Sequence, residues 1–339
     1  MQLNEIWFLI VGFLFIGYFV LDGFDFGVGM SLPFLGKDDT DRRVLINSIG
    51  PVWDLNETWV IVAGASLFAA FPEWYASMFS GFYLPLLLIL AALIARGVAF
   101  EYRGKSHTIG ANEKRWKATF DWMIVVGSAL PALLWGVAFA NIVQGVPLNE
   151  NHIYTGTLFT LLNPYGLLGG LVTLTLFWTH GLIFITLKTD GDIKVRANRL
   201  ATKVGIATTL LAATFLVWTV LAHFSVLGFI LSALAAVSLI AGLAANYFQR
   251  EGISFTMLVV TIITAVGSLF AALFPNVFPS TTNPAFSLTI DNASSSEYTL
   301  TVMTWVAVFM IPLVLLYQGW TYWVFRKRVS RKSIPAGAH

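Results

Sequence analysis

The 339-residue sequence contains no cysteine and few charged side chains. Without cysteine the chain cannot form disulfides, iron–sulfur clusters or thiolate metal sites. Charged residues make up only 11% of the sequence and hydrophobic residues 57%, and the mean hydropathy is +0.75. These values lie outside the range of water-soluble globular domains. The composition therefore predicts an integral membrane protein.

Sequence signatures of nucleotide, metal and haem binding are also missing. There is no P-loop, no Rossmann glycine pattern and no His or Glu spacing typical of a metal site, which excludes nucleotide-driven transport. A chain that holds a pair of membrane haems needs several intramembrane His or Met ligands. Of the five histidines only His180 falls inside an apolar run, and we expect it to be a hydrogen-bonded core residue. We therefore expect this chain to supply no haem ligand and no metal ligand. The other four are His107, His152, His223 and His339.

Long apolar runs separated by polar, Pro or Gly-rich breaks predict nine transmembrane helices in one polytopic domain, 1–339. Helices are favoured over barrel strands because the runs are too long for strands and lipid requires internal backbone pairing. An internal echo, GASLFAAFP at 64–72 and GSLFAALFP at 267–275, favours two four-helix bundles with one peripheral helix. The expected helices are 6–34, 49–71, 75–100, 117–143, 162–187, 201–222, 225–247, 255–274 and 300–325.

Positive charge is distributed in a way that tests this division. Nineteen of the twenty Lys and Arg residues follow the predicted helices 1, 3, 5, 7 or 9, and none follows helices 2, 4, 6 or 8. Loops that retain Lys and Arg stay on the cytoplasmic side. The pattern therefore predicts an outer N-terminus and a cytoplasmic C-terminus. The remaining basic residue, Arg96, lies inside the third helix.

Acidic residues inside the first two predicted helices are the candidate functional groups. Asp22 and Asp25 are three apart and share one helix face, and the helical rise puts them about 18 Å and about 14 Å from the inner end. Asp54 and Glu57 repeat the spacing at the start of the second helix. Each acid in hydrocarbon costs about 2.5 to 3.5 kcal/mol on insertion scales, so it needs a partner, water or a proton.

Ordered by depth from the cytoplasm, Arg96, Asp54, Asp25 and Asp22 form a ladder if the first three helices are neighbours. Our hypothesis is that this ladder carries protons from the cytoplasm toward the membrane centre, because intramembrane ionisable groups are functional by default. Alternatively, Arg96 pairs with an acid only to lock the bundle. The glycines between the acids, such as Gly27, indicate close helix packing rather than a ligand.

Several motifs occur in the order found in a known family. LDGFDFGVGM at 21–30, SIGPVWDLNETW at 48–59, LFAAFPEWYASMFSGFYLPL at 67–86, WGVAFANIVQGVPL at 135–148 and YTGTLFTLLNPYGLLGG at 154–170 resemble cytochrome bd ubiquinol oxidase subunit II. The likeness is clearest over the first half. It implies a nine-helix, haem-poor subunit of a bacterial cell-membrane enzyme that oxidises quinol, reduces dioxygen to water and generates a proton gradient.

The resemblance also implies a partner. Subunit I would carry two haem b groups and haem d, and a small single-helix accessory subunit is left open. In this family the acid pair of helix 1, the Trp-Asp of helix 2 and the Arg of helix 3 have been proposed as a proton path. They match Asp22 and Asp25, Trp53 and Asp54, and Arg96, with Glu57 as a further supporting candidate. The sequence does not assign a structural quinone site.

Two other functions remain as alternatives. A proton-coupled secondary transporter would use buried acids around a midplane substrate site between repeats, with discontinuous helices. A scaffolding subunit without a proton role would tolerate neutral residues at Asp22 or Asp54. No nucleic acid partner is expected, and lipid is the expected surrounding.

Overall fold

The computed structural model describes residues 2–105 and 112–334, and the chain is almost entirely helical within them. Eight helices are long and apolar enough to cross a membrane. They correspond to eight of the expected runs, and most of their ends lie within a few residues of the expected limits. They are α1 (Leu3–Leu35), α5 (Tyr83–Tyr102), α6 (Glu113–Gln144), α8 (Pro164–Lys188), α9 (Gly191–Ala222), α10 (Val226–Tyr247), α11 (Glu251–Leu273) and α12 (Glu297–Val324).

Helix α3 (Trp53–Ala70) corresponds to the remaining expected run, 49–71. It is shorter than the other eight, and its first two turns carry Asp54, Asn56 and Glu57. These polar residues keep it outside the set that qualifies by length and hydropathy. The helix that holds two of the candidate acids is thus the one whose length and hydropathy do not by themselves mark it as a membrane span.

Two expected helix limits are wrong. The run 75–100 is divided at Phe82 into α4 (Pro72–Gly81) and α5, because Pro85 has no N–H to continue the hydrogen-bond ladder of a preceding helix. Helix α9 begins ten residues before the expected 201, where the sequence is charged. Lys194 pairs with Glu251 at 2.5 Å and Arg196 pairs with Asp41 at 2.8 Å, so the extra turns are held by ion pairs beyond the apolar span.

A short helix, α2 (Asp39–Ile49), lies in the segment expected to be a loop after the first span. The Asp38 side chain caps it by accepting a hydrogen bond from the Asp41 backbone N–H at 2.8 Å. Asp39 and Asp41 in its first turn suit the positive end of the helix dipole. Its 11 residues are too polar to have been recognised by hydropathy.

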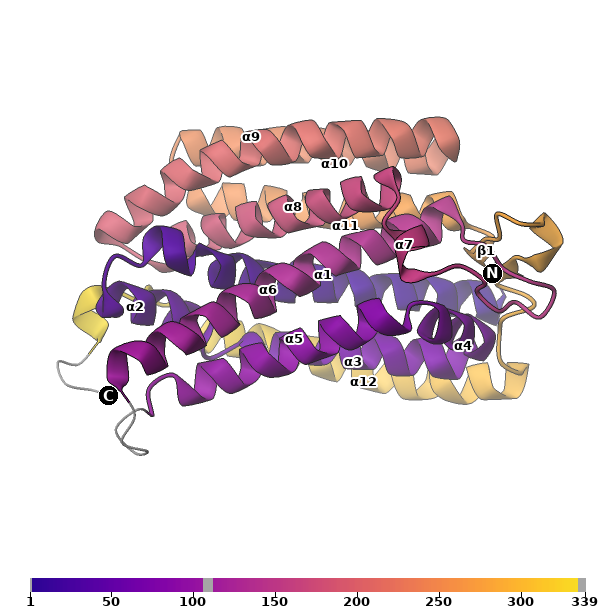
Figure 1. Ribbon diagram of the computed structural model, residues 1–339, viewed down its shortest axis with the longest axis horizontal. Coiled ribbons are helices and arrows are strands. Elements are labelled where there is room, and N and C mark those ends of the chain that lie inside the picture. The colour runs from indigo at the N-terminus through magenta and orange to yellow at the C-terminus, as the bar shows by residue number, and fades with distance from the viewer. Residues whose placement is uncertain (1, 106–111, 335–339) are drawn as a thin grey trace.

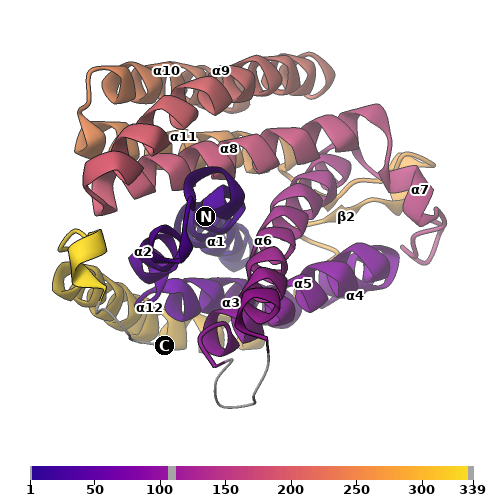
Figure 2. The ribbon, with the colours of Figure 1, turned by 60° about the vertical axis from the view of Figure 1, so that its left-hand side comes forward.

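Helix α1 runs through the middle of the molecule (Figures 1 and 2). It packs against α3, α6, α8 and α11, and α9 and α10 form an outer layer over α8 and α11. Helix α12 lies along α1 and α3 at the edge and is mostly exposed. Residues on α1 therefore face several helices at once, while α12 has a free side.

The basic segments meet at one end of the bundle, as the alternation of charge requires. Arg103 after α5 binds Asp121 of α6 at 2.6 Å and Asp39 of α2 at 2.7 Å. Arg42 binds Asp121 at 2.9 Å, and Arg331, in the 3-10 turn η3 (Arg331–Ser333), binds Asp38 at 2.6 Å. Buried Asp121 therefore joins two arginines from different segments at this end.

The opposite end holds two long connecting segments, 144–161 and 275–299, which contain no Lys or Arg. Strands β1 (Asn276–Phe278) and β2 (Leu288–Thr289) pair antiparallel, with the 3-10 turn η2 (Pro284–Phe286) between them, and α7 (Leu158–Leu161) precedes α8. Helix α1 begins at this end and α12 ends at the other, beside α2 (Figure 1). The two segments bind each other, since the Val146 backbone N–H donates to the Pro279 carbonyl oxygen at 3.0 Å, and they also bind the start of α1, where the Asn4 amide donates to Asp291 at 2.8 Å.

Candidate functional site

Glycines set the position of the acidic segment of α1. A Cβ on Gly27 would lie 2.1 Å from the carbonyl oxygen of Phe177 in α8, and a Cβ on Gly29 would lie 2.1 Å from Ser128 Oγ in α6. Only glycine permits backbones to approach this closely. The segment is therefore fixed at the centre of the bundle, and its residues 22–30 are buried.

Asp22 and Arg96 form an ion pair inside the bundle, and both side chains are 0% exposed. Arg96 Nη2 lies 2.6 Å from Asp22 Oδ1, and Glu57 Oε2 lies 3.5 Å from the same nitrogen. The guanidinium also lies over the Phe26 ring, 4.5 Å from its centroid. One buried cation thus lies beside two carboxylates.

Asp25 belongs to an adjoining hydrogen-bond network. The Asn56 amide donates to Asp25 Oδ2 at 2.7 Å, and Asn56 Oδ1 accepts from Gln318 Nε2 at 2.9 Å and from the Tyr322 hydroxyl at 2.8 Å. Gln318 and Tyr322 are four apart on α12 and therefore share a face. Sequence reasoning missed them, although two polar residues at that spacing within a lipid-facing helix were a usable signal.

The candidate residues are brought together except for Asp54. Its side chain is exposed and forms no hydrogen bond or ion pair with any part of the chain that the structure describes. Trp53 packs on Phe100, with ring centroids 5.1 Å apart. Glu57, expected only as a supporting residue, takes the place next to Arg96 that the ladder gave to Asp54.

The expected ladder is not a line of separate steps, since Arg96 and Asp22, its two ends, touch each other. Helical rise locates each Cα, but the long arginine side chain reaches more than a helical turn from its own Cα. Depth counted along the sequence therefore misjudged which charges meet. The site is a compact cluster rather than a ladder.

Several polar atoms of this cluster find no hydrogen-bond partner among the described residues. They are Asp22 Oδ2, Asp25 Oδ1, and Nε and Nη1 of Arg96. The Tyr18 hydroxyl interacts with Asp22 and accepts a hydrogen bond from Trp135 Nε1 at 3.3 Å. Buried polar atoms of this kind are ordinarily satisfied by internal water.

The histidines offer little to a haem or a metal. His180 is the fully buried histidine of the described residues. Its Nε2 lies 3.1 Å from the Val20 carbonyl oxygen, its ring stacks on Phe255 at 4.9 Å, and its Nδ1 has no hydrogen-bond partner among the described residues. His107 and His339 lie outside the described residues. Within the described ranges, no group of three or more His, Cys, Asp or Glu side chains could hold a metal ion.

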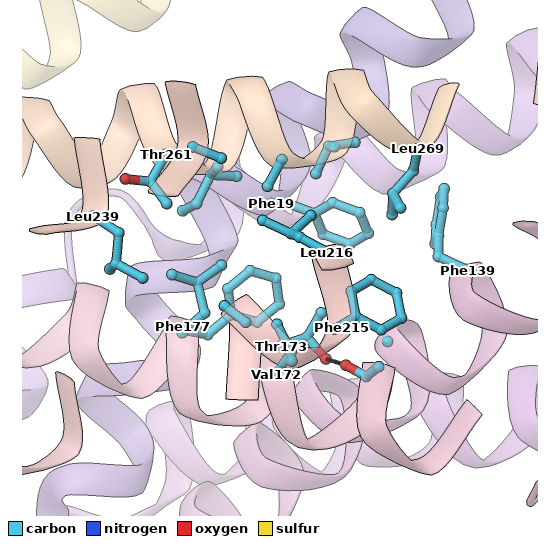
Figure 3. Close-up of a pocket in the computed structure, with 18 of the residues that line it drawn as sticks. Phe19, Phe139, Val172, Thr173, Phe177, Phe215, Leu216, Leu239, Thr261 and Leu269 are labelled. Carbon is cyan, nitrogen blue, oxygen red and sulfur yellow. Dashed lines mark hydrogen bonds between the residues drawn. The ribbon is translucent and has the colours of Figure 1, made fainter. Parts of the chain in front are cut away.

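A separate cavity of about 130 Å³ lies between α6, α8, α9, α10 and α11 (Figure 3). Phe19, Phe177, Phe215 and Leu269 point into it. Its few hydroxyls are engaged elsewhere, as for Thr261, which bonds Ser238 at 2.9 Å. A cavity with such walls stays dry and offers a ligand only apolar contact.

Comparison with known proteins gives one consistent answer. Residues 3–325 match the family model described as cytochrome bd terminal oxidase subunit II. The chain is 41% identical to cytochrome bd ubiquinol oxidase subunit 2 of Bacillus subtilis (strain 168), over 98% of both chains. It is 37% identical to cytochrome bd-I ubiquinol oxidase subunit 2 of Escherichia coli (strain K12), over 99% of this chain and 98% of the relative.

The fold has a solved counterpart. A chain of the bd oxidase structure from Geobacillus thermodenitrificans superimposes with a TM-score of 0.77 at 16% sequence identity, over 96% of this chain and 100% of that chain. At this identity the likeness concerns the fold alone.

Proposed function

The chain belongs to the cytochrome bd terminal oxidase subunit II family, and from this premise we propose that its buried charge cluster passes protons from the cytoplasm toward a redox centre held by subunit I. Membership makes it a multi-pass bacterial membrane protein and a subunit of a quinol oxidase. The enzyme contains haem and uses quinol. In the proposal subunit I holds two haem b groups and haem d.

The observation that carries the proposal is the charge balance of the cluster. Asp22, Asp25 and Glu57 present three carboxyl groups, and Arg96 is the cation beside them. A fully ionised cluster would leave an excess negative charge in the low-dielectric core, which is costly. Protons bound to the cluster remove that charge. Groups that hold protons under these conditions can also exchange them.

Unpaired oxygens of Asp22 and Asp25 support transfer through water. Each carboxyl group has one oxygen hydrogen-bonded within the protein and one without a hydrogen-bond partner among the residues that the structure describes. A water molecule bound to the free oxygens would connect the two acids, and Tyr18 extends the row beyond Asp22. The cluster thus has acceptors and donors on both sides of the arginine.

Asp54 fits the proposal if subunit I covers it. An exposed carboxylate on a membrane helix is costly unless another chain or water surrounds it. The neighbouring α12 also has a large free apolar face. We place subunit I on this α3–α12 face, where it would enclose Asp54 and Trp53 at the cytoplasmic entry to the cluster. Exposed apolar residues of α12 on that face include Trp305, Phe309, Leu313, Leu316 and Trp320.

The topology follows the same proposal. Helix α3 is the ninth span, α1, α3, α5 and α6 form one four-helix bundle, α8 to α11 form the other, and α12 is peripheral. The end that carries Arg103, Arg196 and Arg331 faces the cytoplasm, as the positive-inside rule requires. The N-terminus then lies outside. A small accessory subunit and surrounding lipid complete the assembly.

The test is Asp22→Asn in the complete complex with subunit I. We expect the complex to assemble with the b-type and d-type haem bands of the native enzyme. Quinol oxidation and the membrane potential in proteoliposomes should fall at least tenfold. The matched control is Asp190→Asn, which neutralises an exposed acid at the basic end of the bundle. It should leave quinol oxidation and the membrane potential unchanged.

The two alternatives predict other outcomes. Full turnover and membrane potential in an assembled Asp22→Asn complex would show that the chain is only a scaffold. A chain that carried a solute in proteoliposomes without subunit I would be a secondary transporter. A chain that bound haem stoichiometrically on its own would contradict the assignment of the redox centres to the partner.

A further inference from the structure

A cleft of about 670 Å³ lies at the basic end of the bundle, where α8 and α12 end. It is bounded by the turn before α3 at 47–52, by the ends of α8 and α12, and by the chain that follows α12, 324–333. This last segment is held across the end of α8, because the Val329 backbone N–H donates to the Lys188 carbonyl oxygen at 2.8 Å. The cleft is therefore a built feature of the tertiary structure.

The walls of the cleft differ from its rim. Phe184 and Leu187 of α8 and Phe255 of α11 line the part nearer the membrane-spanning helices. Lys188 and the run Arg326–Lys327–Arg328 line the part where α8 and α12 end. An apolar wall that leads to a basic rim at the end of a bundle matches the two parts of a phospholipid, the acyl chain and the phosphate.

The basic rim is poorly neutralised by acidic residues of the chain. The Lys188 ammonium donates to the carbonyl oxygens of Phe325 and Lys327, and Arg326 donates to the Trp323 carbonyl oxygen at 2.6 Å. Lys327 forms no ion pair with any described residue. Arg328 approaches Glu251 only to 3.9 Å. By contrast, Arg42, Arg103, Lys117, Arg196 and Arg331 at the same end all bind carboxylates within 3 Å.

We propose that this cleft binds an anionic phospholipid of the adjacent leaflet. Its phosphate lies against the rim at Arg326, Lys327 and Lys188, and an acyl chain follows the wall of Phe184 and Phe255. Basic pockets between transmembrane helices recognise anionic headgroups in this way. The apolar wall distinguishes a lipid from a free anion, which would gain nothing from it.

The lipid would also border the proposed proton cluster. Tyr322 lines the cleft, and its hydroxyl donates to Asn56, which in turn donates to Asp25. A bound lipid would cover Tyr322 and keep bulk water from this side of the network. Lipid binding itself does not depend on the proton path, so the two proposals fail separately.

The test measures lipid retained by the complete purified complex. Wild type, Arg326→Gln/Lys327→Gln and the control Lys332→Gln are reconstituted in nanodiscs of phosphatidylglycerol and phosphatidylcholine, then released into detergent and weighed by native mass spectrometry. Lys332 is an exposed base of the same segment that does not line the cleft. Haem spectra confirm that all three complexes are assembled.

We expect wild type and Lys332→Gln to retain one phosphatidylglycerol that the double variant loses. In a detergent titration the affinity should fall roughly fivefold for each charge removed, which corresponds to about 1 kcal/mol for a base near an anionic headgroup. Equal retention by all three complexes would overturn the proposal. So would equal retention of phosphatidylcholine, or displacement of the lipid by inorganic phosphate alone.

Discussion

Replacing Arg96 by methionine should be far more damaging to the fold than neutralising its nearest partner, Asp22. With an effective dielectric constant of about 20, charges 2.6 Å apart attract by about 6 kcal/mol and charges 3.5 Å apart by about 5 kcal/mol. Desolvation offsets most of this attraction, so the pair adds little net stability. Removing the cation is different, because it leaves Asp22 and Glu57 facing each other in the core.

We therefore expect Arg96→Met to cost about 3 to 5 kcal/mol, the usual price of an uncompensated buried charge. Asp22→Asn should cost less than half of that, because Glu57 remains as a counterion 3.5 Å from Arg96. The double variant Arg96→Met/Asp22→Asn should be more stable than Arg96→Met alone. Of the two carboxylates that lie next to Arg96, the double variant keeps only Glu57, whose carboxyl group is 17% exposed and can reach water.

The assay is unfolding of the purified complex by sodium dodecyl sulfate in mixed micelles, followed by tryptophan fluorescence. The four proteins form a double-mutant cycle, which isolates the interaction between the two residues. A loss of less than about 1 kcal/mol in Arg96→Met would refute a dry, buried pair. If Asp22→Asn were as unstable as Arg96→Met, Glu57 would not be a second partner of the arginine.

Three further predictions concern the surroundings of the cluster. Asn56→Leu removes the hydrogen-bond partner of Asp25, Gln318 and Tyr322 on the neighbouring helices, and it should cost about 3 kcal/mol in the same unfolding assay. A loss below about 1 kcal/mol would contradict the network. Gly27→Ala places a methyl group 2.1 Å from a carbonyl oxygen of α8 and should cost about 1 to 3 kcal/mol of unfolding free energy. The control Gly64→Ala adds a methyl group with nothing within 4 Å and should change it by no more than about 0.5 kcal/mol. Equal losses in the two variants would argue against the close packing. A backbone N–H of α2 and then Arg331 hold the pKa of Asp38 below its ordinary value, so its ionised form stabilises the fold above about pH 4 and that contribution is lost as the pH falls through the lowered pKa. Unfolding midpoints measured in acid should therefore decline less in Arg331→Gln than in wild type, and parallel declines would contradict this.

Local composition was sufficient to find most of the membrane helices. The ends of α6, α10 and α12 fall within a few residues of the expected limits because an apolar run long enough to cross lipid has few other structures open to it. The meeting of the basic segments at one end was predicted for a similar reason. Each Lys or Arg resists transfer across the membrane wherever the rest of the chain lies.

Polar segments could not be read in this way. Helix α2 and the first turns of α9 are too charged for a hydropathy pattern, and their helical form depends on partners distant in the sequence. Arg196, for example, is held by Asp41, 155 residues away. Whether such a segment is helix or loop is decided by contacts that its own residues do not specify.

The sequence by itself determined that this protein is embedded in a lipid bilayer and roughly which segments cross it. It also determined that the acids at 22, 25, 54 and 57 and the arginine at 96 are unusual in such segments. Only the tertiary structure decided that Arg96 reaches Asp22 and Glu57, that Asp54 faces outward, and that Gln318 and Tyr322 complete the network around Asp25. The reason is physical. Insertion free energy is a sum over neighbouring residues, whereas the partner of a buried charge depends on how helices pack and how far a side chain reaches.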